Sequence, residues 1–86
     1  MQPDKVAVLE AAKENRKMLY RDYVRDEILI RKTEQFASVQ GLPEKDRIDV
    51  EKQTQSTKMH QADLLVNIAL CDVIIQDLEG GEPVRV

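Results

Sequence analysis

The sequence predicts an all-α protein: a long antiparallel helical hairpin, coiled-coil-like, that dimerises into a four-helix bundle. Three observations support this prediction. The 86 residues include only three Gly, three Pro and three aromatic side chains, against 42% apolar and 34% charged residues, a composition typical of one helix-rich domain. A single strong break, at 41–43, interrupts the chain. On both sides of it, apolar residues recur at intervals of three and four, the spacing of packed helices.

The first helix is expected over about 3–39. Pro3 suits the first position of a helix, where its missing N–H is not needed. A heptad-like line of apolar residues then follows one face, and Arg16, Asp26 and Thr33 occupy the intervening polar positions. We assign the apolar line to the core between the two helices: Leu9, Ala12, Leu19, Tyr23 and Ile30.

The turn between the helices is placed at 40–43. Gly41 suits the left-handed conformation that ends many helices. Pro43 cannot continue the first helix, but it does not obstruct the start of the next. A short turn of this kind joins two antiparallel neighbours, so the second helix is expected to fold back along the first.

The second helix is expected over about 44–79, and Gly80-Gly81 ends it. Residues 1–81 therefore form a single hairpin, and 82–86 form a flexible C-terminal tail. The last three residues, Val84-Arg85-Val86, follow the apolar-x-apolar pattern that a PDZ-type groove binds as an added strand, so a binding role for the tail is the alternative.

The least regular part of the second helix is 51–58, where Thr54, Ser56 and Thr57 are mediocre helix formers. We expect the helix to continue through this stretch, because no Gly or Pro interrupts it and the heptad spacing runs through it unshifted. The alternative is a separate third helix that begins near Lys58 and is capped by Ser56 or Thr57.

The second helix also carries apolar residues on two opposite sides, because two lines of them lie about half a turn apart at about 100° per residue. We assign one line to the core of the hairpin: Met59, Ala62, Val66, Ala69 and Val73. We assign the other line to an oligomer interface: Leu64, Ile68, Cys71, Ile75 and Leu78. One partner helix covers only one line, so the second neighbour is another copy or a different helical protein, and the sequence leaves both open.

Enzyme chemistry has few residues to build on. The chain has one histidine, one cysteine, no glycine-rich phosphate loop and no His/Cys/carboxylate cluster at metal-ligand spacing. We interpret His60 as a surface residue and Cys71 as a small apolar side chain that packs. The sequence therefore predicts no catalytic residue, no cofactor, no metal and no small-molecule ligand.

Compartment and membrane contact follow from the same composition. A lone cysteine cannot form an intramolecular disulfide, and the first residues lack the basic start and apolar run of a signal peptide. The apolar segment at 64–78 is too short to span a bilayer and contains Asp72 and Asp77. We expect a cytoplasmic protein without a membrane segment.

The predicted function is that of a non-catalytic protein–protein interaction module, such as an adaptor, assembly chaperone, inhibitor or structural subunit, which acts through helix–helix packing as an obligate oligomer. Its partner surface beyond the bundle is expected on the first helix: Met18, Tyr20, Lys13, Lys17, Arg21 and Arg25. The alternative is a helical dimer that binds nucleic acid through the basic side of the first helix, where these Lys and Arg side chains lie. A pI near 5.1 and the neighbouring Glu10 and Glu14 weigh against this alternative.

Overall fold

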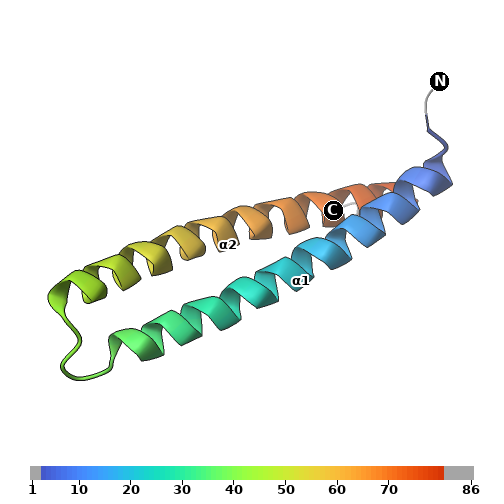
Figure 1. Cartoon of the computed structure of the whole chain (residues 1–86). Coiled ribbons are helices and arrows are strands. Elements are labelled where there is room, and N and C mark those ends of the chain that lie inside the picture. The colour runs from blue at the N-terminus through green and yellow to red at the C-terminus, as the bar shows by residue number, and fades with distance from the viewer. Residues whose placement is uncertain (1–2, 81–86) are drawn as a thin grey trace, which may run out of the picture.

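The computed structural model describes residues 3–80. Two helices, α1 (Lys5–Ala37) and α2 (Glu44–Leu78), lie side by side and antiparallel. The turn joins them at one end, and the start of α1 lies near the end of α2 at the other (Figure 1). The predicted all-helical hairpin is confirmed. Gly81 and the predicted tail at 82–86 lie outside the described residues.

Helix α1 is two residues shorter at each end than the sequence predicts. It begins at Lys5 because the side chain of Asp4 accepts a hydrogen bond from the backbone N–H of Val6 at 3.2 Å, which makes Asp4 the N-cap. It ends at Ala37, where the Ser38 hydroxyl donates a hydrogen bond to the carbonyl of Gln35 at 2.7 Å. A side-chain hydrogen bond of this kind competes with helix continuation.

The turn and α2 follow the predicted pattern more closely. Gly41 has a φ of +80°, a left-handed conformation that glycine adopts without strain. Pro43 precedes the first residue of α2, and α2 then runs without interruption to Leu78, so that 51–58 is helical and no third helix forms. Gly80, with a φ of +68°, follows the end of α2.

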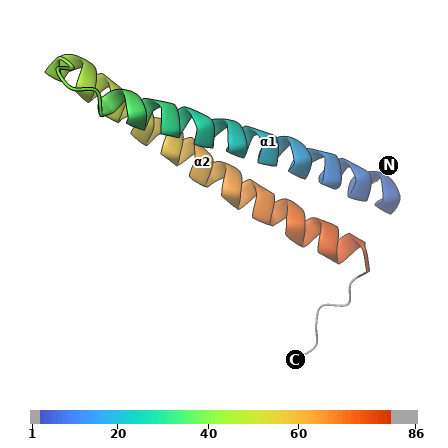
Figure 2. The ribbon, with the colours of Figure 1, turned by 90° about the horizontal axis from the view of Figure 1, so that it is seen from below.

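One line of residues on each helix forms the contact between α1 and α2, which we call the seam. Every member is buried or half-buried. The α1 line consists of Leu9, Ala12, Arg16, Leu19, Tyr23, Asp26, Ile30, Thr33 and Ala37. The α2 line consists of Val50, Thr54, Thr57, Gln61, Leu64, Ile68, Cys71, Ile75 and Leu78. Both lines advance by alternating steps of three and four, as the contact positions of a coiled coil do, and the two helices lie along each other in a second view as well (Figure 2).

The two apolar lines of α2 take the opposite places from those we expected. Leu64, Ile68 and Cys71, which we assigned to an oligomer interface, are only 7%, 7% and 6% exposed and lie in the seam within one chain. Ile75 and Leu78 are half-buried in the same line. The line assigned to the hairpin core is exposed on the other side of α2: Met59, Ala62, Val66, Ala69 and Val73.

The reason for this exchange is side-chain size. Both lines have heptad spacing, so α1 can pack against either. Packing against the line with two Leu and two Ile removes more apolar area from water than packing against the line with two Ala and two Val. The hairpin therefore buries the larger side chains and leaves the smaller ones exposed.

The hairpin encloses little apolar volume. Its buried apolar residues are Ile30, Leu64, Ile68 and Cys71. The Cα radius of gyration is 18.8 Å, whereas a compact domain of this length has about 12 Å. The structure is thus a single layer of two helices, each covered by the other on one side only.

Two adjacent leucines of α2 test the seam. Replacing Leu64 with Ala should lower the free energy of unfolding by about 2–5 kcal/mol, because a buried side chain leaves a cavity. Leu65, which is 49% exposed, serves as the matched control, and Leu65→Ala should cost less than about 1 kcal/mol. Urea unfolding followed by circular dichroism measures both. An equal decrease in the free energy of unfolding for the two variants would contradict the burial of Leu64 between α1 and α2.

Candidate interaction surface

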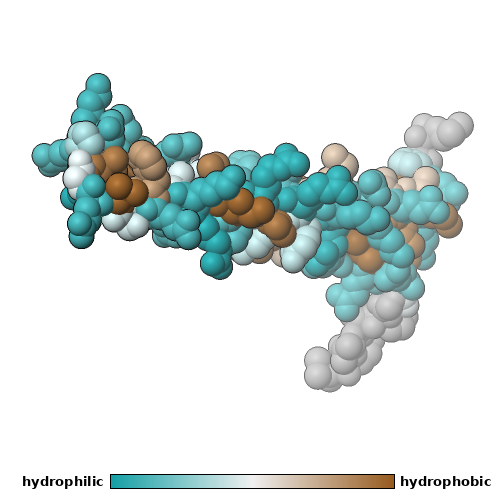
Figure 3. Space-filling view, turned by 60° about the horizontal axis from the view of Figure 1, so that its bottom comes forward, coloured by the Kyte–Doolittle hydropathy of each residue, from teal (hydrophilic) through white to brown (hydrophobic). Residues whose placement is uncertain are grey.

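The side of α2 that faces away from α1 carries a second heptad line, which we call the outer stripe. Its members advance by alternating steps of four and three: Met59, Asp63, Val66, Leu70, Val73 and Asp77. The four apolar side chains are 55–66% exposed. Ala62 and Ala69 lie beside them and are exposed as well. On the surface of the hairpin, apolar patches alternate with hydrophilic ones along its length (Figure 3).

The outer stripe is acidic. Asp63 and Asp77 are exposed, and neither forms an ion pair within residues 3–80. Between Met59 and Leu78, α2 contains three Asp and no Lys or Arg. A partner surface that covers the outer stripe is therefore favoured if it brings positive charge.

The six residues of the predicted partner surface on α1 do not lie in the same surroundings in the structure. Met18 and Tyr20 are exposed, but Tyr20 stacks on Tyr23 of the seam, with ring centroids 6.3 Å apart. Lys13 is bound at 2.9 Å to Glu79, the residue that follows α2, and so belongs to the hairpin itself.

The other three basic residues of the predicted surface, Lys17, Arg21 and Arg25, lie on the outside of α1. Lys17 and Arg25 have acidic neighbours one turn earlier, Glu14 at 4.0 Å and Asp22 at 3.8 Å. Arg21 forms no ion pair with any residue of the described range 3–80. The six predicted residues therefore do not form one continuous basic surface.

Three ion pairs across the seam lie along one of its edges, which we call the ion-paired edge. Lys13 binds Glu79 and Lys58 binds Glu34, at 2.9 and 3.5 Å. Each of these four residues follows a seam residue by one position, and so does Asp72, which binds Arg16 of the seam. The bond to Asp72 raises the pKa of Arg16, first through hydrogen bonding and then through charge. This edge is held by polar contacts and is the less apolar side of the hairpin.

Polar side chains also interrupt the seam near its middle. Asp26 is 14% exposed and binds Nδ1 of His60. The pKa of His60 is raised, mainly by this hydrogen bond and then by the negative charge of Asp26. Next to this pair, the Gln61 amide donates hydrogen bonds to the Tyr23 carbonyl at 3.3 Å and to Glu27 at 3.1 Å. The bond from Gln61 is the largest cause of a lowered pKa at Glu27.

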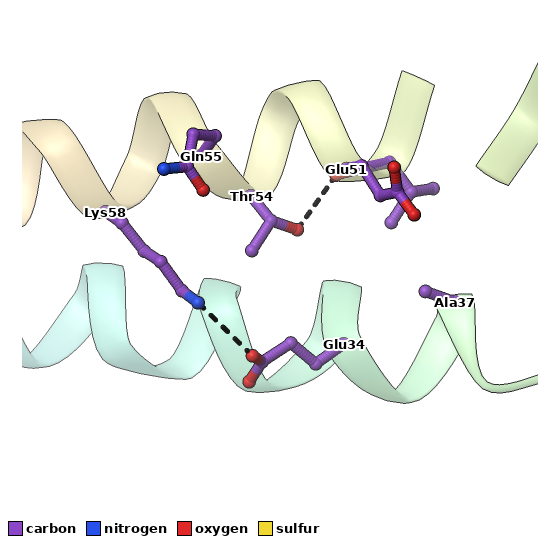
Figure 4. A pocket seen from close by; sticks show the side chains of 7 residues that line it. Glu34, Ala37, Glu51, Thr54, Gln55 and Lys58 are labelled. Atoms are coloured by element: carbon purple, nitrogen blue, oxygen red, sulfur yellow. Dashed lines mark hydrogen bonds and ion pairs between the residues drawn. The ribbon is translucent and has the colours of Figure 1, made fainter. Parts of the chain in front are cut away.

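A shallow groove between the helices lies near the turn (Figure 4). Its lining comes from both helices: Glu34, Ala37, Val50, Glu51, Thr54, Gln55 and Lys58. Lys58 of α2 reaches across to Glu34 of α1, and the hydroxyl of Thr54 is turned back to the Val50 carbonyl at 2.8 Å. This lining contains no His or Cys; Lys58 neutralises Glu34, whereas Glu51 forms no ion pair within residues 3–80.

The two residues that most often carry chemistry are far apart. Cys71 is buried in the seam, where the Asn15 amide contacts its sulfur at 3.6 Å. His60 lies eleven residues earlier on the same helix, a distance of about 16 Å at 1.5 Å per residue. Cys71 therefore packs as a small apolar side chain, and it shares no site with His60.

Among residues 3–80, no group of three His, Cys, Asp or Glu side chains is placed to hold a metal ion. Neither α1 nor α2 has the length of apolar sequence needed to cross a bilayer. Comparison with known proteins found no matching family model, curated protein or solved structure. The candidate surface is therefore argued from its own residues.

Sequence reasoning recognised Met59, Val66 and Val73 as one apolar line but assigned it to the core of the hairpin, and it missed Leu70 and the two carboxylates of the outer stripe. The available signal was the spacing itself, because Asp63, Leu70 and Asp77 continue the heptad intervals of Met59, Val66 and Val73. Because only apolar residues were considered, the charged residues of the same heptad line were not recognised.

The pair of His60 and Asp26 predicts a pH dependence. The folded-state pKa of His60 lies above its ordinary value of 6.5, so its protonation stabilises the folded hairpin. This contribution is fully present below pH 6.5 and is lost as the pH rises through the raised folded-state pKa.

His60→Gln should remove this part of the pH profile of unfolding, and Asp26→Asn should lower the pKa of His60. An NMR titration of His60, the only histidine of the chain, measures the pKa directly. A His60 pKa that Asp26→Asn leaves unchanged would contradict the assignment.

Proposed function

We propose that this protein is a non-catalytic protein–protein interaction module that acts through helix–helix packing as an obligate oligomer. Its role would be that of an adaptor, an assembly chaperone, an inhibitor or a structural subunit. The observation that supports this proposal is the outer stripe, a row of exposed apolar side chains on the side of α2 that α1 does not cover.

The energy at stake is comparable with the stability of a domain. Full burial of one large apolar side chain contributes about 1.5–3 kcal/mol, and Met59, Val66, Leu70 and Val73 are each more than half exposed. Covering the four would therefore contribute several kcal/mol, whereas a typical domain is stable by about 5–15 kcal/mol in total. Contiguous apolar surface of this kind marks interaction sites in soluble proteins.

The simplest oligomer is a dimer in which two hairpins form a four-helix bundle. A helix of another protein on the same stripe is the alternative within this proposal. The buried, unpaired thiol of Cys71 suits a reducing compartment, so we place the protein in the cytoplasm. Nucleic-acid binding has less support, because Lys13, Lys17 and Arg25 already have acidic neighbours.

Molar mass tests the proposal. Light scattering at micromolar concentration should give at least twice the 9.9 kDa mass of the chain. Val73→Asp should remove the association, because it places a charge in the outer stripe. Gln53→Asp adds the same charge to an exposed position of α2 near the turn, outside the stripe, and should keep the wild-type mass. A wild-type chain that is folded and monomeric at this concentration would overturn the proposal.

A further inference from the structure

We propose that the outer stripe is covered by a second copy of this chain, docked through unlike helices, so that the outer side of α1 in one copy lies on the outer stripe of α2 in the other. This inference rests on the proposed function and names the partner of the same surface. It follows from the charges and the heights of the residues on the two outer sides of the hairpin.

A second α2 is poorly suited to the outer stripe. Packing two outer stripes together would bring Asp63 and Asp77 of both copies into one interface. Because α2 has no Lys or Arg between Met59 and Leu78, these carboxylates would find no cation on the other stripe. Uncompensated like charges in an interface are unfavourable.

The outer side of α1 supplies the missing charge. It carries its own heptad line, which we call the α1 outer line: Ala11, Glu14, Met18, Arg21, Arg25, Ile28 and Lys32. Three of its members are basic and only Glu14 is acidic. Glu14 has Lys17 beside it at 4.0 Å, and Arg25 has Asp22 beside it at 3.8 Å. Met18 and Ile28 are 54% and 50% exposed, so the line offers apolar side chains between its bases. The α1 outer line and the outer stripe are thus apolar surfaces of opposite charge.

The heights of these residues also agree. Within the hairpin, Thr33 lies opposite Thr54, with their hydroxyls 2.8 Å apart. A second copy that continues this antiparallel register, with both turns at the same end, has three matched levels. In this register, Arg21 and Glu14 come level with Val66 and Val73, and Asp77 comes level with Glu10. The three matches hold to within one residue: Ile28 comes level with Met59, Arg25 with Asp63, and Met18 with Leu70. An ionic pair then lies between two apolar pairs, an arrangement that sets the register as well as the affinity.

The ion-paired edge does not overlap the surface proposed for docking. Met18, Arg25, Asp63 and Leu70 lie at heptad positions on the side away from the ion-paired edge. Docking there leaves the pairs of the ion-paired edge intact. His60, which binds Asp26, lies on the docking side of the seam. A contact between unlike surfaces of identical chains either closes into a ring or continues from copy to copy.

Two variants that each damage one surface test this docking. Met18→Asp alters the α1 outer line and leaves the outer stripe intact, whereas Leu70→Asp does the reverse. Both positions are more than half exposed, so neither change disturbs the seam. Each variant alone should be monomeric by light scattering at micromolar concentration. An equimolar mixture should regain a dimer, because α1 of the Leu70→Asp chain can dock on α2 of the Met18→Asp chain.

The possible outcomes separate this inference from the proposed function. If Met18→Asp keeps the wild-type mass while Leu70→Asp is monomeric and mixing changes neither, like helices meet and the inference is wrong. The proposed function would survive that result. If the wild-type chain itself is a folded monomer, both fail. Should a single variant unfold, the mixture still decides, because recovery of helical signal and mass together requires the unlike contact.

Charge reversal provides an independent check at one level of the interface. Arg25→Glu and Asp63→Arg should each weaken association by about tenfold or more, because each places like charges together. The chain with both changes should recover most of the wild-type affinity. Lys45→Glu, a reversal at an exposed position in the first turn of α2 and outside both surfaces, should have a much smaller effect. Loss of affinity in the double variant equal to the combined losses of the two single variants would overturn the pairing.

Discussion

The seam depends on one constraint: a neighbouring helix can cover only one side of α2. Apolar residues surround α2 over its second half, and α1 packs against the line that contains Leu64, Ile68 and Cys71. This contact supplies most of the buried apolar surface of the hairpin, so it decides where α1 lies. Once α1 is in place, the outer stripe is on the opposite side and cannot be reached by any part of the same hairpin. The surface available for association is a direct consequence of the intramolecular packing.

The seam combines a well-packed end with a polar end. Leu64, Ile68 and Cys71 are buried in the half of α2 remote from the turn, whereas the buried residues nearer the turn are Ile30 of α1 and Thr54, which is hydrogen-bonded to Thr33. Polar contacts of this type add less stability than apolar packing, but they favour one register over others. The hairpin is therefore held mainly at the end remote from the turn, and the polar pairs align the rest.

The same half of α2 contributes to both contacts. Residues 59–78 hold α1 through the seam and present the outer stripe on the other side. Any partner that covers the outer stripe stabilises the folded hairpin by mass action, because the stripe exists as a surface only when α2 is helical. Association and folding of this chain are thus coupled, which is the physical sense in which we propose an obligate oligomer.

The sequence by itself determined the two helices, the turn around Gly41 and the presence of two apolar lines on α2, because these follow from local spacing and backbone preference. It also placed Leu9, Leu19 and Ile30 on the side of α1 that faces α2. Local spacing was equally compatible with either line of α2 in the seam, and the tertiary structure alone decided between them. The decision rests on side-chain volume, since α1 buries more area against Leu64 and Ile68 than against Ala62 and Val66. The ends of α1, set by side-chain hydrogen bonds at Asp4 and Ser38, and the pairing of Asp26 with His60 across the seam likewise depend on contacts that no periodicity encodes.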